Sequence, residues 1–314
     1  MVDWNKLNEK DKALLARHKI TFIAGSISLT KKRIQELYKT YSNQFLLFGC
    51  LKDDEIPGLE DSLQFTPLRY ENLEKFLSQS KRKCVEILRY FYKDCKYIIQ
   101  ELKPSQVIFI NGSWSGQIHY RSEYWEALNC GAKVTLVSPF QDESDAHTFE
   151  QKIYKSTQKQ KLFKYNHHYS DTELMEICTH VSIRSWDWIG QIGALLIKDH
   201  NIVLSAHNRV LPYEAYQMFA GSIREKKFTP AQEVIETQLT NHAECEILEY
   251  ARREHTDLKG TSLYINIFPC PVCAKILART DIKEIVYTFD HNLGNDIGYK
   301  ILEKCGKKLK RVMI

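Results

Sequence analysis

The sequence lacks several features that would assign a protein to a class at once. No apolar run approaches the roughly 20 residues that a membrane-spanning helix needs. The first dozen residues are charged and lack the apolar core of a signal peptide. Neither a G-x-G-x-x-G pattern nor a Walker pattern is present, and there is no internal repeat. We therefore expect a cytoplasmic protein with no membrane partner and no familiar phosphate-binding loop.

The sequence also lacks the cysteine spacing of a disulfide framework and a strong net charge. The nine cysteines are an odd number and have no framework spacing, which suits a reducing compartment. A formal net charge of +5 over 314 residues is compatible with anionic nucleotides but falls short of a nucleic-acid-binding stripe. We expect a small-molecule nucleotide partner and a homo-oligomer, with nucleic acid as a less favoured partner.

What the chain does contain is a group of metal-binding side chains in its C-terminal half. His242-Ala243-Glu244 is followed by Pro269-Cys270-Pro271-Val272-Cys273. His242, Cys270 and Cys273 would fill three corners of a zinc tetrahedron and leave the fourth for water, as in catalytic zinc sites. The sequence has no second C-x-x-C to close the site. Glu244 stands two residues after the histidine, where it could move a proton of that water.

The segments around these ligands favour the same interpretation. Residues 245–253 predict a helix, 261–268 alternate like a buried strand, and 274–279 predict a second helix. Both ligand groups would then lie at helix N-termini, where the helix dipole favours thiolate over thiol. A C-x-x-C alone would also fit a zinc knuckle, a redox pair or two buried thiols. The upstream His-Ala-Glu favours a catalytic zinc.

These motifs resemble the H-x-E…P-C-x-x-C signature of the zinc-dependent cytidine and deoxycytidylate deaminases. The resemblance covers residues 170–314 and implies an α/β/α domain, a mixed sheet flanked by helices. It implies Zn²⁺ as cofactor, bound by His242, Cys270 and Cys273, and it makes Glu244 the catalytic proton shuttle. It also implies that Ala243 contacts the substrate and that Asn208 holds the sugar or base. Asn208 could equally be a turn residue.

A long insert separates Asn208 from His242, as in the deoxycytidylate branch of the family. Candidates for gripping a 5′-phosphate in this insert are Arg224, Lys226 and Lys227. A solvated loop face is an equally good reading of these three cations. Several family members hold a second zinc with additional Cys and His in this insert. Residues 209–241 contain neither, so the sequence predicts no second metal of that kind.

The N-terminal half consists of apolar runs separated by helical segments. The runs cover 20–24, 45–48, 107–110 and 133–137, with a long amphipathic region over 73–102. Near-continuous apolar runs of this kind indicate a parallel sheet covered on both faces. We therefore expect α/β architecture throughout: a Rossmann-like domain at 14–145, a polar linker, and the deaminase domain at 170–314.

Glycine and small polar residues follow two of these apolar runs. Ligands of open parallel sheets bind beyond the carboxyl ends of the strands. Gly25, Ser26, Gly112 and Ser113 are therefore candidates for a nucleotide pocket. The alternative, which the weak motifs favour slightly, is that glycine only permits tight turns there.

The function predicted from these residues is zinc-dependent hydrolytic deamination of a cytosine (deoxy)nucleotide, with dCMP to dUMP favoured. Zinc-bound hydroxide would attack the ring, and Glu244 would shuttle the protons. Histidine as the first ligand and the segment Ile267-Phe268-Pro269-Cys270 resemble the deoxycytidylate branch more than the free-cytidine enzymes.

Three alternatives stay open. The N-terminal domain could sense a nucleotide and regulate the deaminase as an antiviral effector. The enzyme could instead act on a base in tRNA or single-stranded nucleic acid, which predicts salt-dependent polynucleotide binding. A purely structural metal module is disfavoured, because Glu244 would then have no task.

Overall fold

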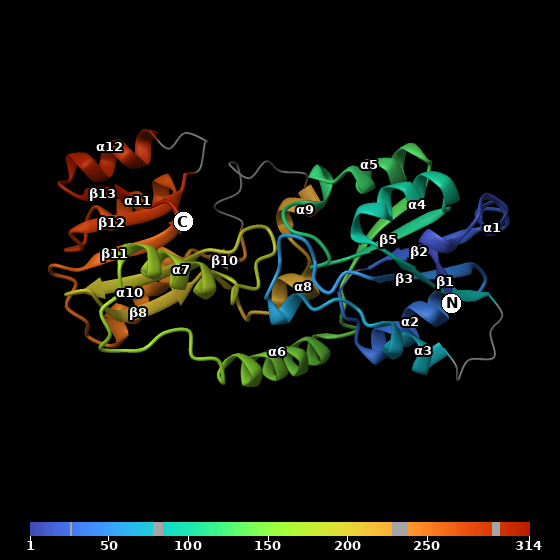
Figure 1. The fold of residues 1–314 in the computed structure, drawn as a ribbon, viewed down its shortest axis with the longest axis horizontal. Coiled ribbons are helices and arrows are strands. Elements are labelled where there is room, and N and C mark those ends of the chain that lie inside the picture. The colour runs from blue at the N-terminus through green and yellow to red at the C-terminus, as the bar shows by residue number, and fades with distance from the viewer. Residues whose placement is uncertain (26, 78–83, 228–237, 291–295) are drawn as a thin grey trace. The chain divides into compact units, whose positions relative to one another are not determined.

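The computed structural model describes residues 1–25, 27–77, 84–227, 238–290 and 296–314, which fold into two compact units (Figure 1). The first unit contains Met1–Gln151 and Ala215–Pro230, and the second contains Lys152–Glu214 and Ala231–Ile314. The sequence predicted domains at 14–145 and 170–314 with one linker. The observed units differ from these predicted domains in two ways. Residues 152–169, expected in the linker, belong to the second unit, and residues 215–230 of the insert between Asn208 and His242 belong to the first.

The first unit is built on a six-stranded sheet in which every pair of neighbours is parallel. The strand order is β1-β4-β3-β2-β5-β6, so the direction of winding reverses between β2 and β5. The strands are β1 (Val2–Asp3), β2 (Ile20–Ala24), β3 (Phe45–Leu51), β4 (Val85–Tyr90), β5 (Gln106–Ile110) and β6 (Lys133–Val137). This confirms the parallel α/β sheet.

Helices surround this sheet and explain its apolar strands. The helices of the first unit are α1 (Glu9–Leu15), α2 (Lys31–Thr40), α3 (Tyr70–Leu77), α4 (Cys95–Leu102), α5 (Ser122–Asn129), α8 (Tyr216–Ala220) and α9 (Ile223–Lys227). The boundary at 151/152 falls within α6 (Glu143–Thr157). All five residues of β2 are buried, as expected for a central strand covered on both faces. The amphipathic region 73–102 is not continuous, because β4 enters the sheet between α3 and α4.

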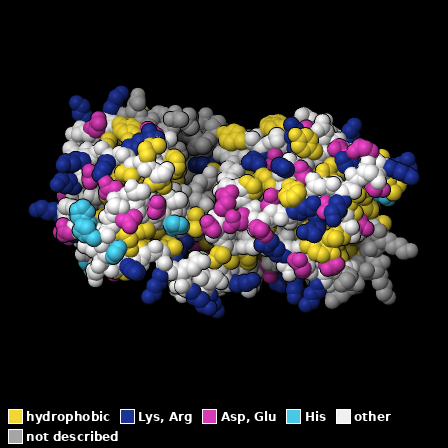
Figure 2. Space-filling model, viewed as in Figure 1, with side chains coloured by type: hydrophobic (Ala, Val, Ile, Leu, Met, Phe, Trp, Pro, Cys, Tyr) yellow, Lys and Arg dark blue, Asp and Glu magenta, His cyan; other side chains and the backbone are white. Residues whose placement is uncertain are grey.

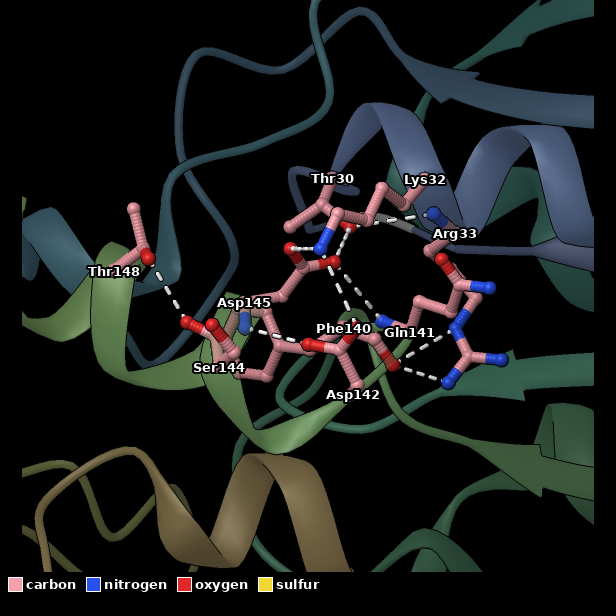
Figure 3. A network of polar contacts seen from close by, with 9 residues as sticks. All are labelled: Thr30, Lys32, Arg33, Phe140, Gln141, Asp142, Ser144, Asp145 and Thr148. Atoms are coloured by element: carbon pink, nitrogen blue, oxygen red, sulfur yellow. Dashed lines mark hydrogen bonds and ion pairs between the residues drawn. The ribbon is translucent and has the colours of Figure 1, made fainter.

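A polar network joins the starts of α2 and α6 (Figure 3). Thr30 caps α2, and its hydroxyl donates to Asp145 Oδ2 at 3.0 Å. Lys32 forms ion pairs with Asp145 and Asp142, and Arg33 Nε donates to the Phe140 carbonyl at 2.9 Å. A carboxylate of the protein itself therefore lies beside the N-terminus of α2, where helices of parallel sheets bind phosphate groups.

The second unit contains a five-stranded mixed sheet in the order β13-β12-β11-β7-β8. Its strands are β7 (Gly193–Lys198), β8 (Asn201–His207), β11 (Ser262–Ile267), β12 (Glu284–Phe289) and β13 (Lys308–Arg311). β7 is antiparallel to both β8 and β11, whereas β11, β12 and β13 run parallel. A separate two-stranded ladder pairs β9 (Arg209–Val210) with β10 (Thr240–Asn241).

Helices cover both faces of this sheet and form two apolar cores. They are α7 (Asp171–Ser182), α10 (Ala243–Arg253), α11 (Pro271–Leu277) and α12 (Asp296–Lys304). Ile247 of α10 and Leu277 of α11 pack in one core, whereas Met175 of α7 packs in the other. This arrangement confirms the expected α/β/α layering. The predicted helix–strand–helix is present, with α10 and α11 beginning at Ala243 and Pro271, earlier than the expected starts at 245 and 274.

The surface carries charges of both signs. On the face seen in Figure 2, Lys and Arg side chains are interspersed with Asp and Glu side chains. This mixture agrees with the modest net charge of +5. Within the described ranges, no helix combines the length and the apolar character that crossing a membrane requires.

Candidate metal centre

The backbone brings the three proposed ligands to the starts of two helices. His242 is the N-cap residue of α10 and directly follows β10. Cys270 is the N-cap residue of α11, where its Sγ accepts from the Cys273 backbone N–H at 3.5 Å. Pro271 occupies the first turn of α11, as the sequence predicted, because a missing N–H costs nothing there.

The donor atoms of these side chains converge on one point. His242 Nδ1 lies 3.6 Å from Cys270 Sγ and 3.4 Å from Cys273 Sγ, and the three donor atoms lie within 4.8 Å of one another. Tetrahedral zinc with ordinary Zn–S and Zn–N bond lengths would hold nitrogen and sulfur about 3.6 Å apart. The structure therefore unites the predicted ligands in a geometry that fits zinc.

The electrostatics of the cluster favour a thiolate. The pKa of Cys270 is lowered to about 4, first by a hydrogen bond with the Cys273 thiol and then by the His242 imidazole. The hydrogen bond with Cys270 in turn raises the pKa of His242 to about 9. Cys273 has a raised pKa and keeps its proton, chiefly through hydrogen bonds with Cys245 and Cys270. A bound metal would displace such protons.

Glu244 lies in the first turn of α10 and is only 4% exposed. Burial raises the pKa of its carboxyl group above the ordinary value, and a hydrogen bond with Cys273 and the charge of His242 oppose this shift. These contacts place the carboxyl group beside the ligand cluster. A raised pKa makes the carboxyl group a better proton acceptor once it is ionised, as a proton shuttle requires.

One contact of the ligand cluster, between His242 and Gln238, could not be predicted from a motif. His242 Nε2, the ring nitrogen that does not face the sulfurs, lies 3.3 Å from Gln238 Oε1. No motif marks this glutamine, and only its position four residues before the histidine could have suggested it.

Asn208 is engaged by the fold itself. Its Oδ1 accepts from the Ile192 backbone N–H at 2.7 Å, and its Nδ2 donates to the Gly190 carbonyl at 2.8 Å. The side chain therefore braces the loop before β7. Ala243, the first residue of α10, is fully buried in the apolar core that α10 forms with the sheet. A substrate contact of either residue stays a prediction.

The cationic residues of the insert lie in the first unit, whereas the metal ligands lie in the second. Arg224 and Lys226 belong to α9, and Lys226 Nζ donates to the Ala220 carbonyl. Lys227 ends α9, and its side chain lies outside the described part of the structure. A phosphate-binding role for these residues stays a prediction.

The insert is anchored on the first unit by a buried carboxylate that the sequence did not reveal. Glu225 Oε1 accepts from Trp114 Nε1 at 2.7 Å and from the Ile118 backbone N–H at 3.0 Å. Asn111 Nδ2 donates to the Met218 carbonyl at 3.1 Å. Segment 215–227 therefore packs against the loop that follows β5.

The N-terminal candidates have packing roles around this loop. Gly112 has φ +83°, and a Cβ there would meet Met218 at 3.4 Å; a Cβ on Gly25 would meet Ile110 at 2.7 Å. Ser113 Oγ accepts from the Ile27 backbone N–H at 3.1 Å, and Ser26 lies outside the described residues. The adjoining cavity, lined partly by Ser113, measures about 10 Å³. That volume holds about one water molecule, so a nucleotide pocket here stays a prediction.

Comparison with known proteins agrees with the chemistry of this centre. Residues 168–289 match the family model of the cytidine and deoxycytidylate deaminase zinc-binding region. The deoxycytidylate deaminase of Enterobacteria phage T4 is 28% identical over 109 residues, which cover 34% of this chain and 55% of the phage protein. The deoxycytidylate deaminase of Homo sapiens is 26% identical over 107 residues, covering 34% and 57% respectively. The chain thus spans about half the length of these relatives.

Among solved structures, the dCMP deaminase of cyanophage S-TIM5 in complex with dCMP and dUMP aligns at 18% identity and a TM-score of 0.35. The alignment covers 46% of this chain and all of the cyanophage chain. The segment that holds His242, Cys270 and Cys273 is therefore similar to the zinc-binding region of cytidine and deoxycytidylate deaminases.

Proposed function

We propose that the protein hydrolytically deaminates a cytosine (deoxy)nucleotide, with dCMP as substrate and dUMP and ammonia as products. The observation that carries this proposal is the convergence of one imidazole and two sulfurs beside the buried carboxyl group of Glu244. The family match of residues 168–289 and the relatives named deoxycytidylate deaminases support it.

In this proposal His242, Cys270 and Cys273 hold zinc, and Glu244 handles the protons. Zinc, when bound, supplies a Lewis acid that makes water a good nucleophile at neutral pH. Glu244 accepts the proton of the attacking water and delivers it to ring nitrogen N3. The water oxygen then forms a hydroxyl group on C4. Glu244 takes the remaining proton from that hydroxyl and gives it to the amine, and the C4–N bond breaks to leave the C4 carbonyl and ammonia.

The test is a substrate panel. Zinc-loaded protein is incubated with cytosine, adenine and guanine nucleosides and nucleotides, and ammonia release and product mass are measured together. Glu244→Gln serves as the blank. We expect ammonia and the uracil product from dCMP. Turnover confined to adenine or guanine compounds, or to polynucleotides, would contradict the proposal.

One observation favours regulation of this activity by the first unit. Segment 215–227, between Asn208 and His242 in the sequence, folds into the first unit. The test measures the rate of dCMP turnover in the presence of nucleoside triphosphates, each added separately. A several-fold change with one of them is the expected result, and a constant rate with all of them would count against regulation.

A further inference from the structure

The imidazole of His242 has two different neighbours at its two nitrogens. Nδ1 faces the sulfurs of Cys270 and Cys273, at 3.6 and 3.4 Å. Nε2, on the other side of the ring, lies 3.3 Å from the amide oxygen of Gln238. An amide oxygen only accepts hydrogen bonds, so Nε2 must be the nitrogen that carries the hydrogen. In the neutral imidazole, the form that binds a metal, Nδ1 then keeps its lone pair directed at the point where the donor atoms converge.

Hydrogen bonds restrain the short segment between Gln238 and His242. The Leu211 backbone N–H donates to the Leu239 carbonyl at 2.7 Å, which extends the β9–β10 ladder to the residue after Gln238. At the other end of this short segment, Asn241 Nδ2 donates to Glu246 Oε1 at 2.7 Å, and Glu246 is buried in α10. The backbone from Leu239 to the start of α10 is therefore restrained on both sides of β10.

We propose that Gln238 is a positioning residue of the metal centre, which fixes the tautomer and the ring orientation of His242 so that Nδ1 can bind zinc. Ligating histidines generally donate their second N–H to an oxygen acceptor, and loss of that acceptor typically weakens metal binding by 10- to 100-fold. The inference rests on the zinc site of the proposed function but not on the identity of the substrate.

The experiment measures zinc affinity by competition with a chromogenic chelator, in the absence of substrate. Gln238→Leu removes the acceptor and keeps a similar volume, Gln238→Glu keeps an acceptor, and Gln100→Leu on the exposed face of α4 is the matched control. We expect Gln238→Leu to bind zinc about 10- to 100-fold more weakly, and the other two variants to stay within about threefold of the parent. Unchanged affinity in Gln238→Leu, or a Gln238→Glu variant as weak as Gln238→Leu, would overturn the inference.

A second measurement separates positioning from packing. Melting temperatures are compared for the parent and Gln238→Leu, both zinc-loaded and after removal of metal. We expect the two proteins to melt together without zinc and to differ when zinc is present, because the residue acts through the ligand. An equal deficit in both states would show that Gln238 only packs. Neither the zinc affinity nor the melting temperature depends on turnover of a substrate. Both results can therefore be interpreted even if the deamination proposal fails.

Discussion

Glu244 combines a buried position with a place beside the candidate ligands, and its chemistry can be tested apart from metal binding. Glu244→Gln keeps the size and polarity of the side chain but cannot exchange a proton. We expect zinc content to stay at the parent level and turnover to fall by about 10² to 10⁴, the usual contribution of general acid–base catalysis. Metal analysis and ammonia release on the same preparation check this. Near-normal turnover with a full complement of zinc would mean that another group carries the protons.

At the residue scale, the convergence of His242, Cys270 and Cys273 was predictable from the sequence, because the motifs tie residue type to spacing. The H-x-E and C-x-x-C patterns suffice because helix and strand lengths then dictate where the donor atoms lie. Gln238 and Glu225 could not be predicted in this way. A glutamine or glutamate in a polar insert carries no signal of its own, and the contact of Glu225 with Trp114 joins residues 111 positions apart.

At the element scale, the buried carboxylate of Glu225 attaches α9 to the loop that follows β5. Glu225→Ala would leave the N–H groups of Trp114 and Ile118 without this acceptor inside the protein. We expect it to destabilise the first unit by about 1–3 kcal/mol, the range for losing hydrogen bonds to a charged acceptor. Glu225→Gln keeps an oxygen acceptor and should cost less. Denaturant unfolding followed by tryptophan fluorescence measures both variants, and equal stability of Glu225→Ala and the parent would refute the anchoring role.

The start of α7 depends on Asp171, which links that helix to β11 and β13. Asp171 accepts from Tyr264 OH at 2.5 Å and forms an ion pair with Lys310. The hydrogen bond and charge of Lys310, followed by the bond from Tyr264, lower the pKa of Asp171. Its stabilising effect is therefore complete above the unfolded pKa of about 3.9 and disappears as pH falls through the lower folded value.

Asp171→Asn tests this contact. Because the side chain is 34% exposed, we expect a loss of only about 0.5 kcal/mol in the free energy of unfolding near neutral pH. The difference between variant and parent should shrink as the pH drops below about 4. Urea unfolding at several pH values measures it, with Asp257→Asn, another surface ion-pair residue, as control. If the difference in the free energy of unfolding did not change with pH, it would come from packing and not from the charge of Asp171.

Strand positions in the first unit were predictable because its central strands consist almost entirely of apolar residues, as in β2, β3 and β5. β4 was missed because its burial pattern is mixed, with Glu86 and Arg89 interrupting the apolar residues. The segments before and after β4 are amphipathic helices, so the sequence of β4 did not stand out from theirs. The strand forms because it pairs with β3.

At the scale of the whole molecule, the chain crosses between its two units at 151/152, 214/215 and 230/231. One linker was expected, because a composition shift marks only the first of these crossings. The return of 215–227 to the first unit depends on Asn111, Trp114 and Glu225, contacts that become visible only when the loop after β5 is in place.

The two units should respond differently to metal. A ligand that binds only the folded state stabilises it by mass action, so zinc should raise the melting temperature of the second unit. We expect calorimetry to show two transitions, of which only one moves down when zinc is removed by a chelator. The Cys270→Ser variant should give the lower transition with or without added zinc. Equal shifts of both transitions would contradict a zinc site confined to the second unit.

The most direct test of the account is a zinc titration of activity. Metal is stripped from the protein, zinc is added back in steps, and dUMP and ammonia formed from dCMP are measured at each step. We predict no turnover without metal and a linear rise in turnover that ends at one zinc per chain. Full activity in the stripped protein, or no turnover of any cytosine nucleotide at one bound zinc per chain, would contradict it.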